Sequence, residues 1–232
     1  MRRRRVVVAL GGAVALQPAL GQVPTPAPAP QAAPRIGEIK PLGGERFQLG
    51  RIVVDKRARR FSVPGRVQAL DKPLEYLATT PDGRKAYESL LVLDTSGSEL
   101  NLACILIGLE RDPKVPSSRQ LTQLGQPVLL SVAWTDTSGR ARQLSAAQAL
   151  SGSDAPEVDW AYIGSFTSID GSQLAADVTG TLASFIKKDR TGIFEAVSGI
   201  SEGSYGSIRG NLALPPEGSA VELVVEAAAP RK

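Results

Sequence analysis

Short apolar segments separated by turn residues are the pattern that most constrains the fold of this chain. From about residue 39 onward, runs of aliphatic and aromatic residues alternate with Gly, Pro, Asp and Ser, which favour turns. Most runs are only a few residues long, as is typical of strands. Pro64-Gly65 within one run indicates a bulge or an edge position. The pattern predicts strands at 47–55, 60–68, 74–79, 89–93, 128–134, 158–163, 174–178, 181–186 and 221–225.

One segment has helical spacing instead. Ser96 and Glu99 form an S-x-x-E capping box, and the residues that follow are apolar on every side of a helix. A helix that is apolar all round is buried, so we expect Cys104 to be a small core residue rather than a reactive thiol. A shorter helix is predicted at 145–150. The predicted fold class is therefore α+β, a mainly antiparallel β-sheet domain with one long buried helix at about 96–110.

The N-terminus has the pattern of a secretory signal peptide. Residues 2–5 are arginines, residues 6–20 carry no charge, and Ala19 and Gly21 are small residues at the two positions that a signal peptidase reads. A mitochondrial presequence is the alternative, but such segments are amphipathic and this one is apolar throughout. The apolar run is shorter than the roughly 20 residues of a membrane-spanning helix. The adjacent arginines leave twin-arginine export open beside the general secretory route.

The predicted organisation is a signal peptide at 1–21, a Pro/Ala-rich linker at 22–38 and a single domain at 39–228. The linker composition favours an extended, polyproline-like spacer. We expect the processed chain outside the cytoplasm, in the bacterial periplasm, with no integral membrane span.

The charge balance argues against a nucleic-acid partner. The chain has 27 Lys and Arg against 23 Asp and Glu, but four of the arginines lie in residues 1–21, so the processed chain is neutral. A nucleic-acid binder needs a surplus of cations to displace phosphate counterions. The basic run at 56–60 is interpreted as a solvated turn between two strands.

The chain has no His and a single Cys, which excludes whole classes of chemistry. Without His there is no Ser-His-Asp triad, no Cys-His pair and no His-ligated zinc. One Cys closes no intramolecular disulfide and binds no conventional iron–sulfur cluster. We therefore expect no cofactor and no metal, and we nominate no catalytic residue.

Eight segments keep a familiar order and spacing over about residues 38–226: 51–55, 61–67, 74–77, 83–91, 134–136, 160–165, 175–180 and 214–216. In the order and spacing of these segments, the chain resembles the YdjY-type domain family. The resemblance implies an exported or lipid-anchored bacterial envelope protein without an assigned reaction. An iron–sulfur segment accompanies the domain in some members, and its cysteines are absent here.

The resemblance also points to one loop. The family usually has His-Glu-Ser where this chain has Tyr87-Glu88-Ser89. A phenol, with a pKa near 10, cannot replace imidazole in neutral acid–base work. Either this chain has lost a functional histidine, or the histidine is not catalytic in the family. Tyr87, Glu88 and Ser89 are candidate ligand-binding residues. The alternative is that Glu88 pairs with a cation in the preceding turn, Arg84 or Lys85, or accepts from amides of the loop.

Two further positions are candidates for ligand binding. Trp160 alternates with Tyr162 and Ser165, which indicates either an aromatic platform for a glycan or peptide, or a buried strand face. Asp177 lies between apolar residues before a Gly, as either a ligand-binding carboxylate or the Asp of a hairpin turn. The surrounding sequence lacks the spacing of a calcium loop.

The favoured function is a non-catalytic extracytoplasmic domain that binds a partner protein or another component of the envelope. The alternative is a carboxylate-dependent hydrolase acting on an envelope glycan, a chemistry that needs no His. Paired carboxylates about 5 to 10 Å apart in an open cleft favour the hydrolase. An exposed apolar patch favours the binding domain.

Overall fold

The computed structural model describes residues 36–110, 125–151, 159–165, 173–185, 191–198 and 207–228. The predicted signal peptide, and the predicted linker up to residue 35, lie outside these residues. A little under half of the described residues are in strands. Most strand pairs are antiparallel, and β5–β6 and β11–β12 are parallel pairs. The described fold is therefore a β-rich α+β fold with a mainly antiparallel sheet. In the described part of the chain, no helix has the length and apolar character needed to cross a membrane.

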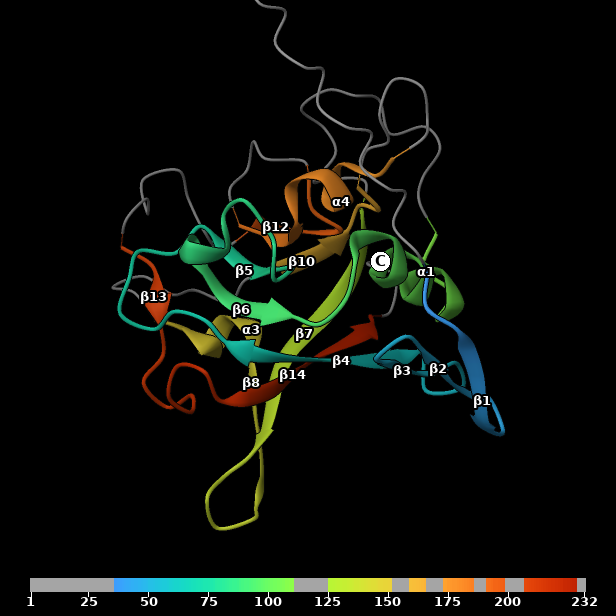
Figure 1. Cartoon of the computed structure of the whole chain (residues 1–232), viewed down its shortest axis with the longest axis horizontal. Coiled ribbons are helices and arrows are strands. Elements are labelled where there is room, and N and C mark those ends of the chain that lie inside the picture. Colours follow the sequence, from blue (N-terminus) through green and yellow to red (C-terminus); the bar gives the residue numbers. More distant parts are fainter. Residues whose placement is uncertain are drawn as a thin grey trace, which may run out of the picture. The chain divides into compact units, whose positions relative to one another are not determined.

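Eight of the described strands close into a ring (Figure 1). Each pairs with the next, and β6 pairs back with β4. In ring order they are β4 (Arg60–Val67), β14 (Ala220–Ala227), β7 (Gln126–Thr135), β10 (Asp159–Tyr162), β12 (Phe194–Ser198), β11 (Thr181–Ser184), β5 (Tyr76–Thr79) and β6 (Ser89–Leu93). Such a ring encloses one face of every strand, where the side chains form the core.

Further strands extend this ring. β3 (Ile52–Asp55), β2 (Arg46–Leu49) and β1 (Ile39–Gly43) follow one another outward from β4 as antiparallel neighbours. β8 (Ala141–Ser145) pairs with β7, and their hairpin projects beyond the neighbouring strands (Figure 1). A small second sheet pairs β9 (Leu150–Ser151) with β13 (Arg209–Gly210). The sequence predicted one strand at 47–55, but Gly50, with a φ of 56°, turns the chain there into the β2–β3 hairpin.

Pro64 lies inside the sheet rather than at an edge, because β4 changes partners at this residue. On one side, β4 pairs with β3 up to Ser62 and with β6 from Gly65. On the other side, β14 pairs with it continuously and without a register shift. Pro64 has no N–H to donate at the change of partner. A side chain at Gly65 would collide with the Val92 carbonyl oxygen.

The long helix is shorter and less buried than the sequence predicted. α1 spans Gly97–Leu106, with the predicted capping box between Ser96 and Glu99, and Ile105 is 52% exposed. It ends early because Gly108 adopts a φ of 81°. The N–H groups of Gly108 and Leu109 then bond back to the last turn, the Schellman geometry that closes many helices.

The basic run at 56–60 contributes to the same helix end. Its turn joins β3 to β4, as predicted, and Arg59 adopts a positive φ of 51°. The Arg59 Nε donates to the Ile107 carbonyl oxygen at 3.3 Å. A cation beside the carbonyl groups of a helix C-terminus is favourable. Cys104 is fully buried in this helix, as predicted, and burial raises the pKa of its thiol.

The other helices are short. α3 (Ala146–Ala149) lies where a short helix was predicted, with a capping box between Ser145 and Gln148. The segment 174–178 was predicted as a strand, but α4 (Ala175–Thr179) is a helix that ends at Gly180, where φ is 76°. Alternation of apolar residues was a poor guide here because Ala176 packs against Gly97 of α1, a contact between segments far apart in sequence.

Candidate functional site

The β5–β6 entrance is the loop that the sequence nominated, and we define it by Glu75, Lys85, Tyr87, Glu88 and Ser89. β5 and β6 are parallel, with Tyr76 opposite Ser89, so both strands begin at the same end. The residues just before them, Glu75 and Glu88, are therefore neighbours, and the Glu75 N–H donates to the Glu88 carbonyl oxygen at 2.9 Å. Parallel pairing thus brings two carboxylates from distant positions to one end of the sheet.

Lys85 lies between these carboxylates. Its Nζ is 2.8 Å from Glu88 Oε2 and 3.8 Å from Glu75 Oε2. The single 3₁₀ turn η1 (Ala86–Glu88) follows Lys85, and in such a turn residues three apart lie above one another. The hydrogen bond to Glu88 is the largest of the effects that raise the pKa of Lys85, so the ammonium stays charged throughout the physiological range. The pairing of Glu88 with the preceding turn is the alternative that the sequence analysis left open.

Ser89 is the first residue of a strand whose five residues are all buried. It is 0% exposed, and its hydroxyl donates to the Leu91 carbonyl oxygen at 2.8 Å. The hydroxyl therefore supports the backbone of its own strand and does not face solvent beside Glu88, whose side chain is 25% exposed.

Trp160 lies in the hydrophobic core rather than on an open surface. It is 3% exposed, and Tyr162, on the same face of β10, is 2% exposed. Tyr162 packs against Phe194 with the ring centroids 6.3 Å apart, and its hydroxyl donates to Asn101 Oδ1 in α1 at 2.8 Å. The Trp160 indole Nε1 has no hydrogen-bond acceptor among the described residues. Of the two readings of this alternation, the burial agrees with a buried strand face.

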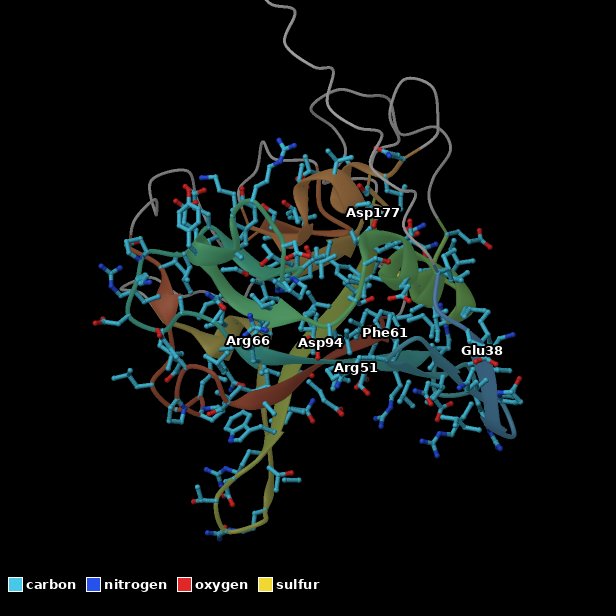
Figure 2. The ribbon with its side chains drawn as sticks, viewed as in Figure 1. Glu38, Arg51, Phe61, Arg66, Asp94 and Asp177 are labelled. Atoms are coloured by element: carbon cyan, nitrogen blue, oxygen red, sulfur yellow. The ribbon has the colours of Figure 1, made fainter. Side chains whose placement is uncertain are left out.

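Asp177 lies on α4 and not in a hairpin turn. Its Oδ1 accepts the Ser98 backbone N–H at 3.0 Å, and its Oδ2 accepts the Ser98 hydroxyl. Ser98 is in the first turn of α1, where the N–H groups have no partner within the helix. A carboxylate there is also favoured by the helix dipole. Asp177 therefore joins α4 to the start of α1 (Figure 2).

The nominated residues occupy separate places. Tyr87, Glu88 and Ser89 lie together where β6 begins, and Asp177 meets the helix that follows the end of that strand. Trp160 lies in the core. The structure thus does not bring these residues into one cluster.

The family comparison covers most of these elements. The model of the YdjY domain matches residues 52–226, about three quarters of the chain. The chain belongs to the YdjY domain family. No curated protein and no solved structure matches it. The matched span of the YdjY domain includes both ends of β6 and begins after β1 and β2.

Tyr87 is the residue at which this YdjY domain departs from the resemblance. Its side chain is 55% exposed, and the Lys85 Nζ lies 5.5 Å from the ring centroid. The ammonium thus lies over the Tyr87 ring, a geometry in which a cation and an aromatic face attract one another. Position 87 therefore lies at the surface beside the carboxylates of Glu75 and Glu88.

Sequence reasoning missed Glu75 and three polar residues that lie in register with the nominated Ser89. Glu195, Ser184, Tyr76 and Ser89 occupy successive register positions across β12, β11, β5 and β6, and all are buried. Glu195 is 1% exposed, and a buried carboxylate is costly unless it is well bonded. The acid within an apolar run at 193–197 was the available signal, but no strand was predicted there.

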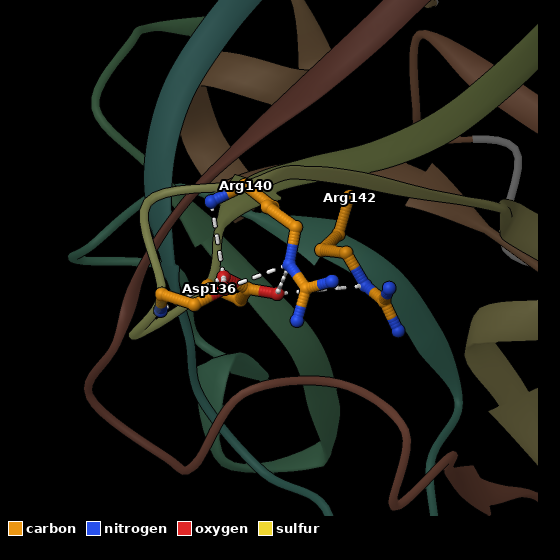
Figure 3. A network of polar contacts seen from close by, with 4 residues as sticks. Asp136, Arg140 and Arg142 are labelled. Carbon is orange, nitrogen blue, oxygen red and sulfur yellow. Dashed lines mark hydrogen bonds and ion pairs between the residues drawn. The ribbon is translucent and has the colours of Figure 1, made fainter.

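A second polar network lies at the tip of the β7–β8 hairpin (Figure 3). Asp136 Oδ1 accepts the backbone N–H groups of Ser138 and Arg140, at 2.9 and 3.0 Å. The Ser138 hydroxyl is the largest of the effects that lower the pKa of Asp136. Arg140 and Arg142 approach the second oxygen at 3.9 and 4.0 Å. Every partner is within six residues, so this network shapes its own turn.

The described residues contain no group of three or more His, Cys, Asp or Glu side chains placed to hold a metal ion. At the β5–β6 entrance the two carboxylates share one permanently charged ammonium. This arrangement offsets part of the negative charge and ties the loop to the residue before β5. A glycosidase places its two carboxyl groups on either side of the scissile bond, whereas here the Lys85 ammonium lies between the two carboxylates.

Proposed function

We propose that this YdjY domain is a non-catalytic, extracytoplasmic binding domain of the bacterial envelope. In this proposal the signal at 1–21 directs export to the periplasm and is removed. The segment 22–38 then serves as a proline-rich spacer, and the domain at 39–228 binds a protein partner in the envelope. The neutral charge of the processed chain and its lack of His support a binding role over nucleic-acid recognition or acid–base catalysis.

The observation that carries the proposal is the exposed edge of β1. Among the described strands β1 pairs with β2 alone, and all five of its residues are exposed. Ile39 and Leu42 are 49% and 46% exposed, and Ile36, just before the strand, is 52% exposed. A strand with an open backbone edge and exposed apolar side chains is a template for an added strand. The proposed mode of binding is therefore addition of an extended segment to β1.

The alternative is a carboxylate-dependent hydrolase of an envelope glycan. The position of Glu75 and Glu88 favours the hydrolase, because both carboxylates lie within 4 Å of the Lys85 ammonium and are therefore close together. Lys85 is the observation against it, since its ammonium lies between the two carboxylates. The binding proposal is the better supported of the two.

Affinity capture from envelope extracts tests the proposal, with the full chain and its Ile39→Lys variant used side by side. The half-exposed Ile39 side chain makes the substitution compatible with folding, which a matching melting temperature verifies. We expect the wild type to retain an envelope protein that the variant loses. Amide exchange at Ile39 should slow when the partner is bound, because strand addition uses that N–H. Equal capture by both chains, without slower exchange, would contradict strand addition.

A further inference from the structure

The open edge of β1 presents a defined set of backbone groups. The Glu38 carbonyl oxygen accepts the Gly50 N–H at 3.3 Å, so this carbonyl points toward the β2–β3 side. In a strand, the N–H and C=O of the next residue point the opposite way. The N–H and C=O of Ile39 therefore face the open edge, and a strand added there bonds to Ile39 first.

The sequence around Ile39 is complementary to itself when read in the antiparallel direction. With Ile39 opposite Ile39 of another copy, Glu38 lies opposite Lys40, and Ile36 lies opposite Leu42. Opposite charges and apolar pairs at facing positions stabilise antiparallel strands. The charges are available, because the side chains of Glu38 and Lys40 are 75% and 59% exposed even though they form an ion pair within the chain at 3.2 Å (Figure 2).

Pro41 agrees with this register. It has no N–H, and in this arrangement it lies opposite Gly37. The Gly37 N–H is already used, since it donates to Glu99 Oε1 at 2.8 Å. The flanking pair of Gly37 and Pro41 therefore has no free backbone N–H. The two central hydrogen bonds join Ile39 of one copy to Ile39 of the other.

The neighbouring registers are unfavourable. A centre at Lys40 places two lysines opposite each other, and a centre at Glu38 does the same with two glutamates, which is destabilising at facing positions. A centre at Pro41 places two residues without an N–H at the central bonding positions. Charge and backbone chemistry thus select one register.

We propose that the β1 strands of two copies of this chain pair antiparallel about Ile39, joining the two sheets across a two-fold axis. The proposal rests on the proposed function, because it names a second copy as the strand that β1 binds. It makes the interface isologous, with each Glu38 facing the Lys40 of the partner copy.

Charge reversal with mixing tests the pairing. Glu38→Lys alone creates two facing lysine pairs in the dimer, and Lys40→Glu alone creates two facing glutamate pairs. Each variant should dimerise on the order of tenfold more weakly than the wild type, or worse. Mixing the two variants should restore a heterodimer of wild-type strength, because every facing pair then has opposite charges. The double variant Glu38→Lys/Lys40→Glu should also dimerise like the wild type.

Sedimentation over a range of concentrations measures the dimer in the full chain. Lys72→Glu is the matched control, since Lys72 is exposed, lies away from β1 and changes the net charge by the same amount as Lys40→Glu. Mixing cannot restore the ion pair within each chain, so a restored dimer must come from opposite charges that face each other between copies. Failure of the mixture to restore the dimer would overturn the pairing.

A wild type that stays monomeric up to about 1 mM also overturns the inference. The proposed function fails separately. It survives if the monomer captures a different envelope protein that Ile39→Lys loses. Strand addition to β1, its proposed mode of binding, fails if the capture does not depend on Ile39.

Discussion

The two ends of β6 both contain carboxylates with polar partners, but they connect different parts of the chain. After the strand ends, Glu99 accepts the N–H of Gly37, which is 62 residues away, and Asp177 accepts that of Ser98, 79 residues away. Before the strand begins, Glu88 bonds to Lys85, three residues away, on a partly exposed loop. Carboxylates that accept hydrogen bonds therefore join distant segments at the start of α1, whereas at the β5–β6 entrance Glu88 bonds within its own loop.

Packing strengthens this contrast. A side chain at Gly37 would lie 2.6 Å from the Gly50 Cα, and one at Gly50 would lie 2.6 Å from Glu99 Oε1. A side chain at Gly97 would lie 2.7 Å from the Ala176 Cβ. Glycines thus let three segments approach the start of α1 closely. At the β5–β6 entrance, by contrast, Tyr87 is 55% exposed and lies at the surface.

The largest expected effect is at Glu99. Glu99→Ala removes the acceptor for the N–H groups of Gly37 and Ser96 and for the Thr95 hydroxyl. Hydrogen bonds to charged groups contribute about 1.5–3 kcal/mol each. Since these groups are only partly buried, we expect a total loss of about 2–4 kcal/mol, measured by urea denaturation. Glu99→Gln should fall between the wild type and the alanine variant. A loss below about 0.5 kcal/mol would show that the junction adds little to folding.

Asp177→Ala should have the next largest effect. It leaves the Ser98 N–H at the start of α1 without its acceptor, and loss of a helix cap costs about 0.5–2 kcal/mol. Asp177→Asn should cost less, because an amide oxygen still accepts from that N–H. The free energy of unfolding of both variants measures the difference. Equal losses would show that the charge matters and the hydrogen bond does not.

Lys85→Met should destabilise the fold by only about 0.5–1 kcal/mol, because exposed ion pairs are screened by solvent. The pKa of Lys85 is raised by folding, so its contribution is complete below the unfolded value of 10.5 and is lost as the pH rises above it. The stability difference between wild type and variant should therefore be constant from pH 6 to about pH 10 and shrink above that. A difference that grows above pH 10 would contradict the assignment.

Glu88→Gln should have the smallest effect, about 0–1 kcal/mol, because Lys85 keeps Glu75 as a partner. The control is Glu222→Gln at an exposed position of β14. Thermal stability and capture of the envelope partner are measured on the same preparation. Unchanged melting with weaker capture would return Glu88 to the binding site and move the proposed interface away from β1.

The sequence predicted the parts of this fold that depend on neighbouring residues. The capping box at Ser96 and Glu99, the buried run of β6 and the burial of Cys104 follow from spacing and composition within one segment. The same holds for the pairing of Glu88 with its own turn, which was one of two open readings. Membership of the YdjY domain family also followed from short segments in order, and the match over 52–226 confirms it.

Only the tertiary structure decided what depends on residues far apart in sequence. Pairing β6 with both β4 and β5 closes the sheet and places Glu75 beside Lys85, and neither pairing leaves a local signal. α4 is a helix packed against Gly97 of α1, where alternation within the segment predicted a strand. The spacing of residues within a segment predicts which of its side chains lie on the same face of a strand or helix. Register and packing between segments decide which of them meet.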